Sequence, residues 1–175
     1  MKPLYMIGCV NEIGERQKAD NVSGLLGESG FREYMNQLDT PLETGYLFRI
    51  GIDHFKEIND NFGQEYGDFV LKKTAECISG CLSEGQRVYK LVADEFLILD
   101  ASSDETKDAD KLYDKVREAI DRFIETNEFK VMYTVSGGIV PFAALKGNQC
   151  SEALKLTDFA LNEANEAGKK PLLYI

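Results

Sequence analysis

Apolar residues follow two different periods along the chain, and the two periods alternate. Short apolar or alternating runs predict strands, and apolar residues that recur every three or four positions predict amphipathic helices. Residues 45–53 are apolar at both parities up to Ile50, which is typical of a central strand covered on both faces. Strands are predicted at 4–10, 45–53, 87–92, 96–101, 129–142 and 171–175.

Segments with helical periodicity lie between the predicted strands. Helices are predicted at 29–38, 68–82, 103–127 and 151–168. The stretch 54–68 reads as a loop-rich turn with a short helical piece, and Gly137 and Gly138 indicate a bulge or a close approach of another backbone. This order predicts an α+β fold, in which helices flank a mostly antiparallel central sheet of the ferredoxin-like, palm type.

The tip of a predicted hairpin carries two adjacent carboxylates, Asp94 and Glu95. Ala-Asp-Glu is a poor turn sequence, because tight hairpins favour Asn-Gly or Asp-Gly. Two interpretations are open at this point. The tip is either a polar turn with two solvated acids, or a pair of carboxylates that faces a cation.

Charge and composition narrow the classes of partner. A net charge of −10 argues against nucleic acid or an anionic membrane surface as the main partner. No apolar stretch approaches the roughly 20 residues of a membrane helix, so we expect no membrane insertion by this segment. Scattered cysteines and a single histidine do not suggest a zinc site. Free thiols without an export signal suggest a cytoplasmic setting, although the parent protein could be attached to a membrane.

Five segments, in order and at the right spacing, resemble the motifs of the GGDEF family. They are "DNVSGLLGESGF" (20–31), "IDHFKEINDNFGQEYGDFVL" (52–71), "KLVADEF" (90–96), "TVSGGIV" (134–140) and "TDFALNEANEAGKKPLLYI" (157–175). The third stands where the family has R-Y-G-G-D-E-F. The resemblance implies a GGDEF domain over 20–175.

Family members with intact motifs are diguanylate cyclases, which condense two GTP molecules, one held by each half of a dimer, into cyclic di-GMP. The resemblance implies two-metal phosphoryl transfer with Mg²⁺ or Mn²⁺. It implies that Asp94 is a metal ligand and that Glu95 assists the attacking hydroxyl. It also implies that Asn59 and Asp68 hydrogen-bond the guanine base and that Lys56 contacts a phosphate.

These matches have plainer alternatives. Asn59 also fits a turn, Asp68 fits an acid at a helix N-terminus, and Lys56 fits an ordinary surface lysine. An amide and a carboxylate nevertheless suit guanine, because a carboxylate can accept hydrogen bonds from both N1–H and N2–H. We therefore expect the geometry of guanine contact to be kept.

The sequence departs from the family pattern where metal and phosphate would be held. The metal-binding Asp of the first strand aligns with Gly51, which supplies no ligand, and Asp53 is the alternative carboxylate. The Gly-Gly before the acids is Val92-Ala93. Val92 adds a β-branched side chain and loses access to positive φ, or is simply a better strand residue. The phosphate lysine of the last helix aligns with Asn165.

These departures predict a degenerate GGDEF domain without catalytic activity, which binds GTP weakly and regulates an attached domain such as a cyclic di-GMP phosphodiesterase. One alternative is an active diguanylate cyclase with a modified metal site. Another is a scaffold that binds only protein partners. We also expect a homodimer. Residues 1–19 resemble the end of a PAS sensor domain, or else form a plain strand and helix.

Overall fold

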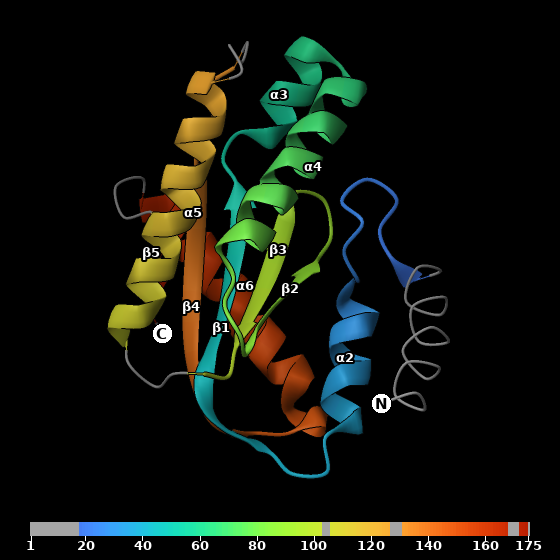
Figure 1. Ribbon diagram of the computed structural model, residues 1–175, viewed down its shortest axis with the longest axis vertical. Helices are drawn as coiled ribbons and strands as arrows, with labels where there is room; N and C mark the ends of the chain where they lie inside the picture. Colours follow the sequence, from blue (N-terminus) through green and yellow to red (C-terminus); the bar gives the residue numbers. More distant parts are fainter. Residues whose placement is uncertain (1–17, 103–105, 127–130, 168–171, 175) are drawn as a thin grey trace.

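The computed structural model describes residues 18–102, 106–126, 131–167 and 172–174. Within this part of the chain, five strands form one sheet in the order β2-β3-β1-β4-β5 (Figure 1). β1 pairs antiparallel with β3 and β4, β2 pairs antiparallel with β3, and β5 runs parallel to β4. The strands are β1 (Leu42–Ile52), β2 (Gln86–Lys90), β3 (Glu95–Asp100), β4 (Val135–Leu145) and β5 (Leu172–Tyr174).

Helices cover both faces of the sheet. The helices are α2 (Glu28–Gln37), α3 (Phe55–Phe62), α4 (Gln64–Cys81), α5 (Thr106–Thr126) and α6 (Cys150–Ala167), with a short 3₁₀ turn, η1 (Gly147–Gln149), before α6. The α4 and α5 helices lie on one face, and α2 and α6 lie on the other (Figure 1). The prediction of an α+β fold with a mostly antiparallel sheet is confirmed.

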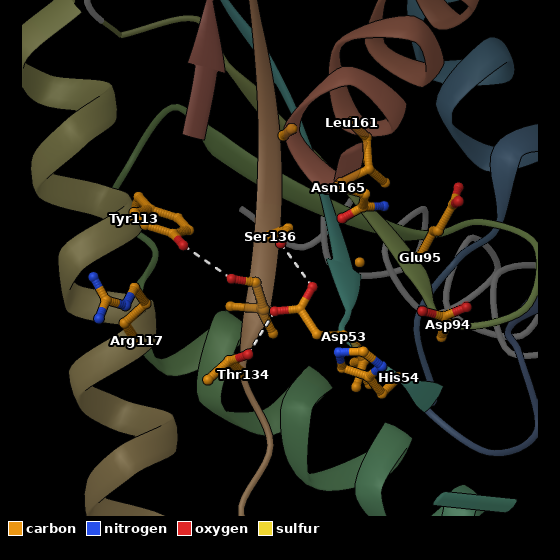
Figure 2. A pocket seen from close by; sticks show the side chains of 14 residues that line it. Asp53, His54, Asp94, Glu95, Tyr113, Arg117, Thr134, Ser136, Leu161 and Asn165 are labelled. Carbon is orange, nitrogen blue, oxygen red and sulfur yellow. Dashed lines mark hydrogen bonds between the residues drawn. The ribbon is translucent and has the colours of Figure 1, made fainter. Parts of the chain in front are cut away.

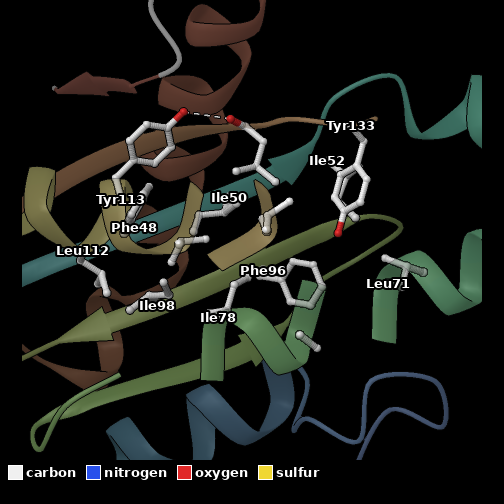
Figure 3. Packing of buried hydrophobic residues seen from close by; sticks show 14 of the residues in the cluster. Phe48, Ile50, Ile52, Leu71, Ile78, Phe96, Ile98, Leu112, Tyr113 and Tyr133 are labelled. Carbon is white, nitrogen blue, oxygen red and sulfur yellow. Dashed lines mark hydrogen bonds between the residues drawn. The ribbon is translucent and has the colours of Figure 1, made fainter. Parts of the chain in front are cut away.

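The central strand β1 contributes to two separate cores, as its apolar residues at both parities predict. Phe48 and Ile50 face α4 and α5, where they pack with Ile78 and Leu112 (Figure 3). Leu47 faces the other way and packs under α2 and α6. Burying apolar side chains on both faces fixes the register of β1, because a slip of one residue would exchange the two sets. That register sets the position of every site residue on this strand.

Two expected features differ in the structure. The helix predicted at 68–82 begins at Gln64, because Gly63, at φ +88°, both ends α3 and caps the start of α4. Asp68 therefore lies in the second turn of α4 and is not an acid at a helix N-terminus. The strand predicted from residue 129 begins only at Val135 among the described residues.

Gly138 allows α6 to lie close to the sheet. A Cβ added there would lie 2.5 Å from the backbone nitrogen of Leu161 and 2.6 Å from the Cβ of Ala160. The expected close backbone approach is thus present on β4. It brings the C-terminal half of α6 over the ends of β1 and β4, where the candidate site lies.

Candidate functional site

A pocket of about 610 Å³ opens between α5 and α6 at the ends of β1 and β4 (Figure 2). The tip of the β2–β3 hairpin forms one wall, and α5 forms the opposite wall. The lining residues are Gly51, Ile52, Asp53, His54, Asp94, Glu95, Tyr113, Arg117, Thr134, Val135, Ser136, Leu161, Ala164 and Asn165. The pocket therefore gathers the acids of the hairpin tip and the aligned positions Gly51 and Asn165.

The two acids lie at the tip of the predicted hairpin. The backbone N–H of Glu95 donates to the carbonyl of Val92 at 3.2 Å, and that of Leu91 donates to the carbonyl of Glu95 at 2.8 Å. Ala93 has φ +55°, in the left-handed region, whereas the φ of Val92 is not positive. The turn thus keeps a glycine-like conformation at position 93, and the side chain of Val92 points into solvent with 75% of its surface exposed.

Lys90 holds this tip from inside. Its buried ammonium group donates to the carbonyl oxygens of Leu91 at 2.7 Å and Ala93 at 2.5 Å. Burial lowers the pKa of Lys90, and the negative charges of Asp20 and Asp94 oppose that shift. Lys90 is therefore a structural cation of the hairpin, with its donors directed at backbone carbonyls.

Gly51 lies opposite Glu95 in the β1–β3 register. A Cβ added at Gly51 would lie 3.8 Å from the Oδ2 of Asp94, 3.8 Å from the Cγ of Glu95 and 3.2 Å from the Cδ2 of Leu161. A carboxylate at this position would therefore stand beside both hairpin acids. Glycine leaves that place without a ligand, and Leu161 of α6 borders it.

Asp94 is half-buried at the edge of this gap. Burial raises the pKa of Asp94, and the neighbouring charge of Glu95 raises it further. The protein surroundings therefore disfavour the charged form of this carboxyl group. A nearby cation would reverse that preference.

Glu95 is held by Arg49, a residue that the sequence analysis missed. The Nε of Arg49 donates to Glu95 Oε2 at 2.6 Å, and its Nη2 lies 2.5 Å from the same oxygen. The same Nη2 lies 3.3 Å from Asp158 Oδ1 on α6. A basic residue in the middle of the apolar strand 45–53 was the signal that could have found it, because a buried charge requires a partner.

Asp53, the alternative carboxylate, is directed toward β4. It accepts hydrogen bonds from Thr134 Oγ1 at 2.5 Å and from Ser136 Oγ at 2.7 Å (Figure 2). Its backbone N–H also donates to the carbonyl of Thr134 at 2.9 Å. Two hydroxyl donors thus fix this carboxylate against the neighbouring strand.

The residues matched to guanine recognition lie outside the pocket, on α3 and α4. Asn59 lies on α3, and its Oδ1 is only 1.7 Å from the place a Cβ would take on Gly67. That oxygen is buried and has no hydrogen-bond partner among the described residues. Asp68 follows Gly67 directly and is half-buried, while Lys56 is exposed on α3. The structure therefore places Asn59 and Asp68 on adjoining turns of two packed helices.

The acids at the tip do not fit the pair of divalent ions that the resemblance implies. Gly51 offers no side-chain oxygen, and Glu95 is already engaged by a guanidinium group. In the described ranges, no group of three acidic, histidine or cysteine side chains converges on a point that could hold a metal ion. Asp94 remains as the tip carboxylate that Arg49 does not engage.

The family model described as "Diguanylate cyclase, GGDEF domain" matches residues 18–171. The chain belongs to the GGDEF family. This chain is 28% identical over 154 residues to the cyclic di-GMP phosphodiesterase NbdA of Pseudomonas aeruginosa. The aligned region covers 86% of the chain and 19% of NbdA. The chain is 30% identical over 149 residues to the probable diguanylate cyclase DgcT of Escherichia coli. That aligned region covers 82% of the chain and 32% of DgcT.

Solved structures show the same fold. The crystal structure of the diguanylate cyclase SiaD in complex with its activator SiaC, from Pseudomonas aeruginosa, matches with a TM-score of 0.79 at 21% identity. The match covers 99% of the GGDEF domain described here and 68% of the SiaD chain. The chain spans less than a third of each of the two curated relatives, NbdA and DgcT.

Residues 1–17, which include the strand predicted at 4–10, lie outside the described ranges. The resemblance of 1–19 to a PAS domain falls mostly on residues outside the described ranges, and the family match begins at residue 18. None of the described helices is long and apolar enough to cross a membrane.

Proposed function

We propose that this GGDEF domain is a regulatory module of a cyclic di-GMP signalling protein and does not synthesise cyclic di-GMP. One observation carries the proposal. Gly51 stands where a metal-binding carboxylate would face Asp94, and the neighbouring Glu95 is paired with Arg49. Position 51 then supplies no carboxylate, and Arg49 offsets the charge of Glu95, so Asp94 is left without the partner that two-metal phosphoryl transfer requires.

The expected loss of rate is large. Diguanylate cyclases of this family generally use Mg²⁺ or Mn²⁺. Losing one ligand of such a site removes several kcal/mol of transition-state stabilisation, which is of order a thousandfold in rate. The neutral Asn165, which lines the pocket at the aligned lysine position, lowers the attraction for a triphosphate further.

The base-recognising part of the site is the better preserved. The contact of Asn59 with Gly67 and the position of Asp68 on the next helix support weak binding of GTP through its guanine base. Lys56, exposed on α3, would contact a phosphate. Such binding without turnover would let nucleotide occupancy influence an attached domain.

The parent protein is proposed to carry further domains. The similarity to NbdA, named as a cyclic di-GMP phosphodiesterase, covers 19% of that protein and supports an attached phosphodiesterase domain. We place the GGDEF domain at 20–175 and a connection to an upstream sensor of the PAS type at 1–19. The domain is proposed to work in the cytoplasm and to pair with a second copy.

An active diguanylate cyclase is the competing function. It is favoured by the retention of both Asp94 and Glu95 and by the left-handed backbone that Ala93 keeps at the tip. Incubation with GTP and Mg²⁺ or Mn²⁺, followed by chromatography for cyclic di-GMP, separates the two. We expect no product. Product from the natural chain that disappears in Asp94→Asn would support the cyclase.

Calorimetry with GTP tests the regulatory role against that of a ligand-free scaffold. We expect heat of binding and a thermal shift at millimolar GTP, both reduced in Asp68→Asn. The absence of both signals in the natural chain would support a domain that binds only protein partners.

A further inference from the structure

The guanidinium group of Arg49 lies at the meeting point of three elements. It extends from β1 toward Glu95 at the hairpin tip, and its Nη2 also lies 3.3 Å from Asp158 of α6. Its Nη1 donates to the carbonyl oxygen of Leu154, one turn before Asp158, at 3.4 Å. Three oxygens from two elements therefore surround one cationic group.

This cluster is not an ordinary surface ion pair. The side chain of Arg49 is 10% exposed and that of Glu95 is 23% exposed, so solvent screens their attraction poorly, whereas Asp158, at the outer side of the cluster, is 51% exposed. Both nitrogens that contact Glu95 meet the same oxygen, Oε2. Without Arg49, the carboxylates of Glu95 and Asp158 would face a common point with no opposite charge between them.

Oxygen ligands from carboxylates and a carbonyl are the set that hard divalent cations prefer. The same three atoms, Glu95 Oε2, Asp158 Oδ1 and Leu154 O, already surround the guanidinium. The arginine thus neutralises the tip with a charge that belongs to the chain. Its fixed planar donors also link the hairpin to α6.

We infer that Arg49 is a resident cation which takes the place of a divalent ion at the hairpin tip, so that the natural chain, which also lacks a carboxylate at position 51, excludes Mg²⁺ and Mn²⁺ from this site. The inference deepens the proposed function, because a tip that carries its own cation needs none from solution. Replacing Arg49 with a neutral side chain would then turn the cluster into a metal site, with Glu95 and Asp158 as ligands.

Titration of the full chain with Mn²⁺, followed by the electron paramagnetic resonance signal of the free ion, tests the inference without nucleotide. The natural chain should show no binding below millimolar Mn²⁺. Arg49→Met, which keeps an unbranched side chain of similar length, should bind at least about tenfold more tightly. Arg49→Met with Glu95→Gln should lose that gain, because one of the two carboxylates is neutralised.

Arg117→Met is the matched control, because Arg117 is a cation on α5, on the pocket wall opposite the hairpin tip, where its guanidinium lies 5.7 Å from the ring centroid of Tyr113. It should leave Mn²⁺ binding unchanged. Far-UV circular dichroism establishes that each variant is folded. Equal Mn²⁺ affinity of the natural chain and Arg49→Met would overturn the inference.

A second measurement covers the case in which Arg49→Met does not fold. The thermal midpoint of the natural chain should be the same in EDTA and in millimolar Mn²⁺, and a rise with Mn²⁺ would contradict a resident cation. Neither readout involves GTP or cyclic di-GMP. A chain that makes cyclic di-GMP would refute the proposed function, whereas metal binding beside an intact Arg49 would refute this inference alone.

Discussion

The side-chain oxygen of Asn59 lies 1.7 Å from the position that a Cβ would take on Gly67, so the amide rests directly on the backbone of α4. Gly67→Ala must displace Asn59, which we expect to offset the usual gain of alanine in a helix by about 1–3 kcal/mol. Gly80→Ala, on the same helix with open space around it, should raise the free energy of unfolding by up to about 1 kcal/mol. Urea unfolding measures both. Equal gains in the two variants would show that Asn59 does not depend on this glycine.

Asp68 is expected to accept hydrogen bonds from guanine. Asp68→Asn removes the charge and replaces one acceptor with a donor, so GTP affinity should fall about tenfold or more. Glu65→Gln, which neutralises an exposed acid on the same helix, should leave the affinity unchanged. Calorimetric titration with GTP gives both values. Equal losses in the two variants would indicate a general effect of charge on α4.

Ala93 holds a left-handed backbone that an L side chain adopts at a cost. Ala93→Gly should relieve about 1–2 kcal/mol of strain and lose about 0.5–1 kcal/mol through the freer unfolded chain, for a small net gain in the free energy of unfolding. Val92→Gly, at an exposed neighbour without positive φ, has no strain to relieve and should lower it. Denaturant unfolding of the two variants checks their opposite signs.

Asp94 links stability to pH. Burial, and then the charge of Glu95, raise its pKa above the unfolded value of 3.8, so the folded chain binds more protons between the two values. The contribution of this group to stability therefore falls as pH rises from the unfolded pKa through the folded one. Asp94→Asn should stabilise the chain at neutral pH by less than about 1 kcal/mol, since the group is partly solvated.

The advantage of Asp94→Asn over the natural chain should shrink as pH falls toward the unfolded pKa, because the native carboxyl is then protonated as well. Thermal or urea unfolding of both chains across this range measures the difference. An advantage that stayed constant with pH would mean that the buried charge is not its source.

Gly51→Asp would place a third carboxylate beside Asp94 and Glu95. In EDTA, it should lower the free energy of unfolding by about 1 kcal/mol or more relative to Gly51→Asn, because the two side chains match in size and differ in charge. Millimolar Mn²⁺ should narrow that gap. Identical stabilities of the two variants in EDTA would mean that the new carboxylate does not face the hairpin acids.

Restoring the turn along with the ligand extends this test to nucleotide binding. Gly51→Asp with Val92→Gly and Ala93→Gly should increase the metal-dependent part of GTP affinity. Calorimetry in EDTA and in Mn²⁺ separates that part from the guanine contacts. An unchanged metal dependence would remove the lost ligand as a cause of weak binding.

Much of the fold could be predicted because burial leaves a clear pattern in the sequence. The apolar runs on each side of Asp94 predict the two strands of a hairpin, and the dense apolar run at 45–53 marks a strand covered on both faces. The start of α4 could not be predicted, because Gln64 and Glu65 are polar residues without an apolar period. The helix starts at Gln64 because of the backbone conformation of Gly63, which is visible only in the structure.

The candidate site was less predictable for a different reason. The motif spacing identifies Asp94, Glu95 and Gly51, but spacing cannot show which groups already have partners. The pairing of Glu95 with Arg49 joins residues 46 positions apart, and the contact with Asp158 adds a third element. Such pairings follow from strand register and helix packing, which are set by the whole chain.

The ammonium group of Lys90 donates hydrogen bonds to two carbonyl oxygens of its own turn. The loop is therefore held by a covalently attached cation, which cannot dissociate as a bound ion can. A partner protein docking on this loop would meet the same contour at every magnesium level and every nucleotide level. In the proposed regulatory role, the domain would therefore present this loop in one fixed shape to any neighbouring domain.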